Sequence, residues 1–261
     1  MVGHAADTSS VCSPLRLATS RLRAGAAARP QASTIRTVKR SPRERADGES
    51  VSELTTARLS VYLRSLEALE ASGVNTVSSR GLAEQFRLNA AQIRKDLAQF
   101  GEFGVRGVGY YVKDLRRHLR EILGLDRQLK VVILGAGNLG LALADYPGFR
   151  HDGFDVVALL DTARDKVGQY SRSGVPIRHA RELERLAERE RLDIAVLAVP
   201  AESAQEVVDA VVGAGVKAIL NFTPGSLRVP KGVKLKNVDL TVSLESLSFF
   251  LARGVDVPEV S

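Results

Sequence analysis

The stretch from Lys130 to Tyr146, KVVILGAGNLGLALADY, constrains the fold of this chain more than any other. An apolar run rich in β-branched residues breaks at Gly135, Gly137 and Gly140 and then becomes helical. A dinucleotide pyrophosphate needs this order of strand, turn and helix start. The first glycine allows the tight turn, the second lets backbone approach the phosphates, and the third lets the helix pack on the strand. We therefore predict a nucleotide site here, formed by Gly135, Ala136, Gly137, Asn138, Leu139 and Gly140.

An acidic residue follows the turn at a suitable distance. Asp161 ends the next apolar run, VVALLD, 26 residues after Gly135. A carboxylate at this place can accept both ribose hydroxyls of NAD and would repel the additional phosphate of NADP. This pairing favours nucleotide binding over an ordinary glycine turn.

The second half of the chain alternates β-prone and helical segments, which predicts a parallel sheet with helical crossovers. Strands are expected at 130–134, 154–160, 194–199 and 217–221, and helices near 139–146, 180–191 and 201–213. The loops that leave the last two strands would lie at the carboxyl edge, where such sheets bind ligands. Each loop could also be an ordinary turn. The candidate cofactor contacts in these loops are Val199, Pro200, Asn221 and Pro224.

The first half reads as a winged helix-turn-helix. Helices are expected at 54–69, 81–86, 90–100 and 113–125, with a glycine-rich hairpin at 101–112. Ser52 or Thr55 would cap the first helix, and Ser78 or Ser79 the second. Asn89 and Gln92 have the spacing of a capping box at the start of the third.

The helix at 90–100 is the candidate reader of DNA. Its apolar positions leave Arg94 and Lys95 pointing away from the core, where Arg94 could contact a guanine edge and Lys95 a guanine or a phosphate. Arg106 at the tip of the hairpin suits the minor groove of A·T-rich DNA. With Gln92, these three residues form the predicted DNA contacts. Alternatively, the two charges of the helix only form its solvated face.

Composition limits the compartment and the partners. The net charge of +7 resides in residues 1–46, which hold nine basic and two acidic residues, whereas the rest of the chain is balanced. We expect residues 1–47 to be a disordered basic tail, although their composition also resembles a transit peptide and could serve non-specific nucleic-acid contacts. Cys12 is the single cysteine, and no apolar run is long enough to span a bilayer. A cytoplasmic protein without a membrane partner is therefore expected.

Catalytic groups are hard to find in the sequence. None of the four histidines follows a core strand at the ligand edge, and no metal-ligand spacing occurs. We therefore predict that the protein binds no metal and is not an enzyme, and that it senses the nucleotide without consuming it.

The C-terminal segment 242–252 is predicted to be a helix that is apolar on more than one side. Leu240, Leu244, Leu247 and Leu251 form one stripe, which Phe249 and Phe250 widen. Such a helix suits insertion between domains or subunits, although it could also simply cover the sheet.

Taken together, these segments resemble the Rex family of bacterial redox-sensing transcriptional repressors. The similar stretches include SSRGLAEQF, QIRKDLAQFGEFGVRGVGY, ILGAGNLGLALADYPGF and ILNFTP, and the resemblance extends from about residue 54 to 251. It implies a homodimer that binds a palindromic operator, a Rossmann domain that distinguishes NADH from NAD, and a C-terminal helix swapped between subunits. NADH would release the DNA.

The resemblance also implies a switch that joins the two subunits. Tyr146 takes the place of a tyrosine near the nicotinamide, with Asp239 and Arg64 as its partners across the dimer. Two positions depart from the family: Ala163 stands where a second acid is common, and Leu240 where a phenylalanine is common. An NAD-dependent oxidoreductase with an appended helical domain and a CoA-binding module are the alternatives.

These observations divide the chain into five parts. They are a tail (1–47), a winged-helix domain (48–128), a Rossmann-like domain (129–241), a C-terminal helix (242–253) and a short tail (254–261).

Overall fold

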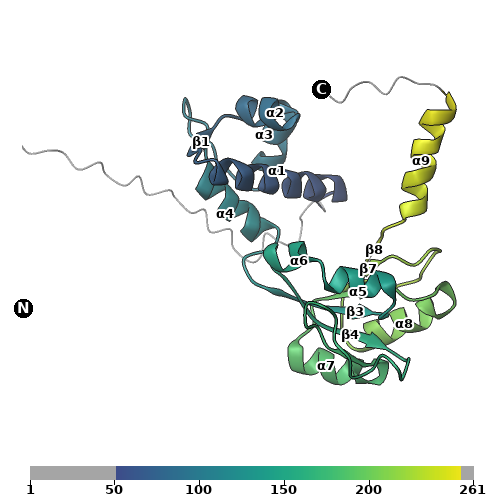
Figure 1. Ribbon diagram of the computed structural model, residues 1–261. Coiled ribbons are helices and arrows are strands. Elements are labelled where there is room, and N and C mark those ends of the chain that lie inside the picture. The colour runs from purple at the N-terminus through teal and green to yellow at the C-terminus, as the bar shows by residue number, and fades with distance from the viewer. Residues whose placement is uncertain (1–50, 254–261) are drawn as a thin grey trace, which may run out of the picture. The chain divides into compact units, whose positions relative to one another are not determined.

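A computed structural model describes residues 51–253 of the chain (Figure 1). The predictions for the two tails, including Cys12, lie outside these residues. No helix in the described part is long and apolar enough to cross a membrane.

The first half consists of four helices and two very short strands. In chain order they are α1 (Glu53–Ala71), β1 (Thr76–Val77), α2 (Ser79–Phe86), α3 (Ala90–Ala98), β2 (Tyr110–Tyr111) and α4 (Val112–Ile122). Side chains cap three of the helices: Ser52 accepts the N–H of Thr55, Ser78 that of Gly81, and Asn89 that of Gln92. These caps satisfy N–H groups that would otherwise have no partner, which explains why the helices begin where they do.

Three details of the first half differ from the prediction. Only half of the expected capping box forms, because the side chain of Gln92 turns to Asp96 and not back to Asn89. The hairpin is also shorter than expected, since it is closed by a single bridge between Val105 and Gly109. β2 pairs antiparallel with β1, a strand that the sequence did not indicate.

A single apolar core holds this half together. One face of α1 packs against α4, and the helices α2 and α3 complete the cluster. Its fully buried members include Leu59, Leu66, Leu82, Ile93 and Leu119. Leu59 and Leu66 lie seven residues apart, two turns of one face, as the helical period predicts.

The second half is a parallel six-stranded sheet in the order β5-β4-β3-β6-β7-β8. Its strands are β3 (Leu129–Leu134), β4 (Phe154–Asp161), β5 (Ile177–His179), β6 (Ile194–Leu197), β7 (Ala218–Asn221) and β8 (Lys234–Asn237). The helices between them are α5 (Asn138–Ala144), α6 (Pro147–His151), the 3-10 turn η2 (Ala180–Glu182), α7 (Leu183–Glu190) and α8 (Ala201–Gly213). The predicted α/β class with a Rossmann-like sheet is confirmed, whereas α6, β5 and β8 were not predicted.

Helices cover both faces of the sheet (Figure 1). Successive residues of β3 therefore alternate between two cores: Val132 and Leu134 pack on the side of α7 and α8, and Val131 and Ile133 on the side of α5. This double burial explains why the strand reads as an unbroken apolar run. The chain moves from β3 to β4 on one side and later to β6 on the other. Strand order therefore reverses beside β3, and sheets of this kind bind ligands outside the carboxyl ends of the strands at such a point.

The last helix, α9 (Leu240–Arg253), begins two residues before the predicted start and has no buried residue within the chain. Its leucine stripe is exposed by 60 to 84%. An apolar helix with this much exposure has no partner among the described residues of its own chain.

We expect Leu119→Ala to destabilise the first half, because Leu119 is completely buried on α4. The lost contacts and the cavity should lower the free energy of unfolding by about 2–5 kcal/mol in urea denaturation. Leu54→Ala is the control, since Leu54 is 72% exposed and its loss should change stability by less than about 0.5 kcal/mol. Equal losses for the two variants would contradict the assigned core.

Candidate nucleotide and nucleic-acid sites

The glycine turn after β3 leaves no room for side chains at two of its positions. Gly135 has a φ of +101°, and a Cβ there would collide with the carbonyl oxygen of Ala198. A Cβ on Gly140 would collide with the carbonyl oxygen of Gly135. At Gly137 the space is open, and a Cβ there would have no neighbour within 4 Å. Two glycines therefore serve the protein's own packing, while the third leaves space in which a ligand can reach backbone.

Asp161 connects this turn to the end of β4. Its Oδ2 accepts the N–H of Ala136 at 2.8 Å, and its Oδ1 accepts the N–H of Ala163 at 2.9 Å. Lys166 Nζ lies 3.4 Å from Oδ2, a partner that the sequence analysis did not single out. Burial acts in the opposite direction, but the two N–H groups and Lys166 hold the pKa of Asp161 below its ordinary value. The carboxylate is therefore ionised and fixed beside the glycine turn.

The two predicted loops at the carboxyl edge are joined to each other. Thr223 Oγ1 donates to the carbonyl oxygen of Val199 at 2.9 Å, and Pro200 is the N-cap residue of α8. Asn221 is completely buried: its amide nitrogen donates to Thr223 and Asn237, and its oxygen accepts the N–H of Thr223. These contacts occupy its polar atoms, so Asn221 shapes the loop from within. Of the four predicted contacts in these loops, Pro200 and Pro224 are exposed.

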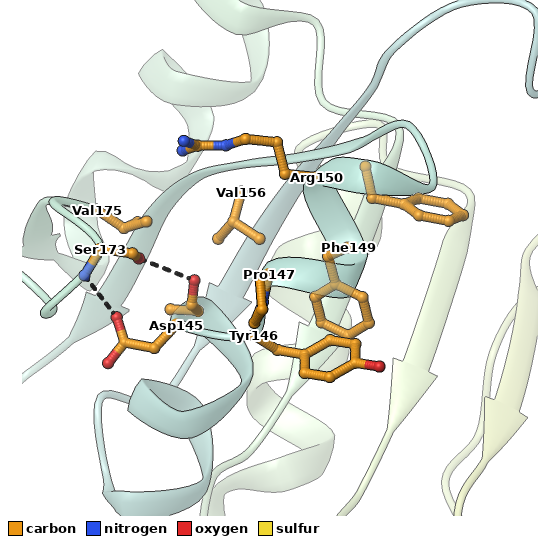
Figure 2. Close-up of a pocket in the computed structure, with 10 residues that line it drawn as sticks. Asp145, Tyr146, Pro147, Phe149, Arg150, Val156, Ser173 and Val175 are labelled. Carbon is orange, nitrogen blue, oxygen red and sulfur yellow. Dashed lines mark hydrogen bonds between the residues drawn. The ribbon is translucent and has the colours of Figure 1, made fainter.

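Tyr146 lies at the junction of α5 and α6 and is 56% exposed. Its ring meets that of Phe149 edge to face, with centroids 5.2 Å apart (Figure 2). A cavity of about 160 Å³ lies beside them and is lined also by Phe154 and Val156. Ser173 also lines this cavity. It donates its N–H to Asp145 at 2.8 Å and its hydroxyl to the carbonyl oxygen of Ala144 at 3.1 Å. These two hydrogen bonds hold the end of α5 just before Tyr146.

The other two residues of the expected switch are also exposed. Arg64 lies on the outer face of α1, and Asp239 precedes α9, where its Oδ1 accepts the N–H groups of Thr241 and Val242. Since their expected contact joins two subunits, the arrangement within one chain leaves it a prediction.

The predicted DNA contacts gather on α3 and at the wing. Arg94 and Lys95 are exposed, and Arg94 donates to Ser79 Oγ on α2 at 2.8 Å. Arg106 is exposed at the tip of the closed turn between Val105 and Gly109. Gln92 is half-buried, and its Nε2 donates to Asp96 Oδ1 at 2.7 Å. The cations therefore have the expected exposure, while Gln92 has an internal partner that the sequence analysis overlooked.

Two family models match the two halves. Residues 50–98 match the model described as putative DNA-binding protein N-terminus, and residues 126–225 match the model described as CoA binding domain. A helix-turn-helix with an exposed cationic face, joined to a nucleotide-type sheet, defines the class of transcription regulators that carry a ligand-binding domain.

Similar proteins narrow this class. The chain is 48% identical over 199 residues to the redox-sensing transcriptional repressor Rex of Desulfitobacterium hafniense, covering 76% of this chain and 94% of that protein. It is 49% identical over 199 residues to Rex of Thermus thermophilus, covering 76% and 93%. The protein therefore belongs to the Rex family of redox-sensing transcriptional repressors.

Solved structures agree with this assignment. The crystal structure of RSP in complex with beta-NAD+ and operator DNA has a TM-score of 0.75 at 41% identity, covering 78% of this chain and 94% of that chain. RSP in complex with beta-NADH has a TM-score of 0.70 at 39% identity, covering 79% and 97%.

The glycine turn yields a stability test. Gly140→Ala should lower the free energy of unfolding by about 1–3 kcal/mol, because its methyl group would force α5 away from β3. Gly137→Ala should stay within about 1 kcal/mol of wild type, since Gly137 has an ordinary φ of −79° and open space around it. Chemical denaturation of both variants measures the difference, and a larger loss at Gly137 would contradict the assigned packing.

Proposed function

We propose that this protein represses transcription by binding operator DNA as a homodimer and that NADH releases it from the DNA. The observation that carries the proposal is the presence in one chain of two sites: the Asp161-anchored glycine turn and the exposed Arg94–Lys95 pair of a helix-turn-helix. RSP, which is similar over nearly its whole length, is described in complex with NAD+ and operator DNA and in complex with NADH.

The nucleotide part of the proposal assigns a role to each element at the carboxyl edge. The backbone of Gly135 to Gly140 would face the pyrophosphate, with the open side of Gly137 allowing close approach. Asp161 would accept the ribose hydroxyls. Val199, Pro200 and Pro224 would border the nicotinamide side, with Asn221 supporting them. Reduced nicotinamide is neutral and more apolar than the oxidised cation, so a dry pocket at Tyr146 would favour NADH.

The DNA part of the proposal rests on α3 and the wing. The N-terminal residues of a recognition helix reach base edges, and Arg94 and Lys95 project from the exposed side of α3. Arg106 would enter the neighbouring minor groove. Winged-helix dimers read two half-sites that share the twofold symmetry of the protein, which fits a palindromic operator.

We propose that α9 is exchanged between the two subunits. Seven apolar side chains of this helix are exposed by 40% or more: Leu240, Val242, Leu244, Leu247, Phe249, Phe250 and Leu251. Contiguous apolar surface of this kind marks an interaction site. Exchange would also bring Asp239, at the start of α9, to the partner subunit, where the trio with Arg64 and Tyr146 could form.

The proposed domain limits follow the described elements: 48–128 for the winged helix, 129–241 for the sheet domain and 242–253 for the exchanged helix. α4 ends at Ile122 and β3 begins at Leu129, so a short connection separates the first two. Ala163 and Leu240 would adjust the fit around the adenosine and the reduced ring.

A CoA-binding module is the second candidate, because the family model that matches residues 126–225 bears that description. The fixed carboxylate of Asp161 favours a ribose with free 2′- and 3′-hydroxyls, whereas CoA carries a 3′-phosphate that it would repel. Titration calorimetry with NADH and with CoA distinguishes the two. We propose no catalytic role: His151 ends α6, and His179, which ends β5 in register with Asp161, accepts the N–H of Arg181 at its Nδ1.

Band-shift titration on a palindromic promoter fragment tests the function directly. NADH should dissociate the complex at concentrations where NAD leaves it intact, because the ligand can shift the protein only by its different affinities for the two states. Equal effects of NADH and NAD, or no operator binding, would exclude the proposed function.

Asp161→Ala should separate the two activities of the protein. Losing the ribose contact should weaken NADH binding by about tenfold or more in calorimetry, the effect expected of a hydrogen-bonded charged group. Operator affinity without NADH should remain near that of wild type, because Asp161 lies in the sheet domain. An unchanged NADH affinity would remove Asp161 from the site.

Leu247→Glu tests the role of α9. A charge in the middle of the leucine stripe should shift the protein from dimer towards monomer in analytical ultracentrifugation. Tyr170→Glu is the matched control, because Tyr170 is 69% exposed in the loop between β4 and β5 and lies outside α9. A dimer that both variants leave intact would contradict the exchange of α9.

A further inference from the structure

Asp96 is a buried carboxylate in the helix that the proposed function assigns to DNA. Among residues 51–253 it is the one acidic or basic residue that is completely buried. Burying an ionised carboxylate is costly unless charge and hydrogen bonds compensate for it. The groups that surround Asp96 must therefore compensate for its burial.

Three donors from two helices surround Asp96. Arg58 of α1 donates from Nε to Oδ2 at 2.6 Å and from Nη2 to Oδ1 at 2.8 Å, and the hydroxyl of Tyr62 donates to Oδ2 at 2.9 Å. Gln92, one turn earlier on α3, donates from Nε2 to Oδ1 at 2.7 Å. The hydrogen bonds from Arg58, opposed by burial and helped by Gln92 and Tyr62, hold the pKa of Asp96 below its ordinary value. Asp96 is thus an ionised group that only accepts hydrogen bonds.

This chemistry decides which way the amide of Gln92 faces. A primary amide can present either its oxygen or its NH₂ group to a neighbour, and only the hydrogen-bond network settles the choice. An ionised carboxylate has no proton to donate, so the NH₂ group must face Asp96. The carbonyl oxygen Oε1 and the second N–H of Gln92 are then left for another partner.

The position of Gln92 on α3 indicates what this partner is. Gln92 lies in the first turn of the helix, the part of a recognition helix that meets base edges, and is half-buried at the border of the exposed face with Arg94 and Lys95. An amide with one acceptor and one donor free matches adenine, which offers the N6 amino group as donor and N7 as acceptor in the major groove. It matches the edge of guanine poorly, because guanine presents two acceptors there.

We propose that Gln92 reads one adenine in each operator half-site and that the Arg58–Asp96 pair is the positioning device that sets its amide for this base. The inference rests on the proposed function, since it requires that α3 enters a major groove. It assigns Arg58 and Asp96 an indirect role in specificity, while Arg94 and Lys95 supply the cationic contacts.

The test begins with a duplex selected from a random-sequence pool by the wild-type protein. Each adenine is then replaced in turn by 7-deazaadenine, which lacks the N7 acceptor, or by purine, which lacks the amino group. One adenine per half-site should lose about tenfold in affinity with either analogue. Gln92→Ala should bind the natural duplex more weakly and should no longer distinguish the analogues at that position.

Asp96→Asn then tests the positioning role. The new amide brings a donor into the cluster and removes the constraint on Gln92, so the penalty for the two analogues should fall several-fold. Binding to non-operator DNA and its salt dependence should remain those of wild type. Tyr62→Phe is the matched control, because it removes a hydrogen bond to the same carboxylate without touching Gln92. It should retain the full adenine preference.

A second variant tests the positioning role if Asp96→Asn does not fold. If Asp96→Asn fails to fold, Arg58→Met/Asp96→Leu replaces the pair with apolar side chains, an exchange that proteins often tolerate. Retained adenine preference in a folded Asp96 variant, or in Gln92→Ala, overturns the inference while leaving the repressor function intact. Failure of the wild-type protein to select any duplex would overturn the proposed function, and the inference with it.

Discussion

The close approach of α5 to β3 is the contact on which the nucleotide half depends. Gly140 lies so near the carbonyl oxygen of Gly135 that no side chain fits between helix and strand. This approach brings the first turn of α5 to the point where the strand order reverses. The hydrogen bond between Asp161 and Ala136 and the position of Tyr146 after the helix both follow from that geometry.

Each half of the protein uses one fixed carboxylate to hold the segment that meets the ligand. Asp161 receives backbone N–H groups and thereby ties the glycine turn to the end of β4. Asp96 receives side-chain donors and thereby ties the recognition helix to α1. Both are ionised at neutral pH, because hydrogen bonds outweigh the effect of burial on their pKa. α1 also carries Arg64, so the helix of the expected switch and the reading helix are directly joined.

The sequence predicted those elements that have a regular repeat of apolar residues or a characteristic glycine pattern. β3, β4, α1 and α3 were predicted because burial on one or two faces leaves a regular apolar pattern. β5 and β8 were missed, since they are short edge strands, and β8 reads KLKN, which has no apolar alternation. α6 is only five residues long, and Pro147 at its start was the one available signal.

The misjudged side chains share a cause: a tertiary partner competed with a local one. Gln92 had the spacing of a capping box, in which its amide oxygen would accept the N–H of Asn89. Instead its NH₂ group donates to the buried carboxylate of Asp96 one turn later, a stronger, charge-assisted hydrogen bond. Asn221 follows a strand at the ligand edge, but its amide is consumed by Thr223 and Asn237, and residue 237 belongs to a strand that the sequence did not reveal. Local spacing cannot show partners that only the fold brings near.

The exposure of α9 has a consequence for how such a protein behaves at different abundances. A chain whose leucine stripe faces water gains stability when a second copy covers it, so folding and pairing become linked by mass action. In the proposed dimer, dilution would favour dissociation and expose apolar surface. A high local concentration of protein on DNA would favour the dimer. The amount of protein in the cell would then help to set the point at which the regulator responds, alongside the nucleotide it senses.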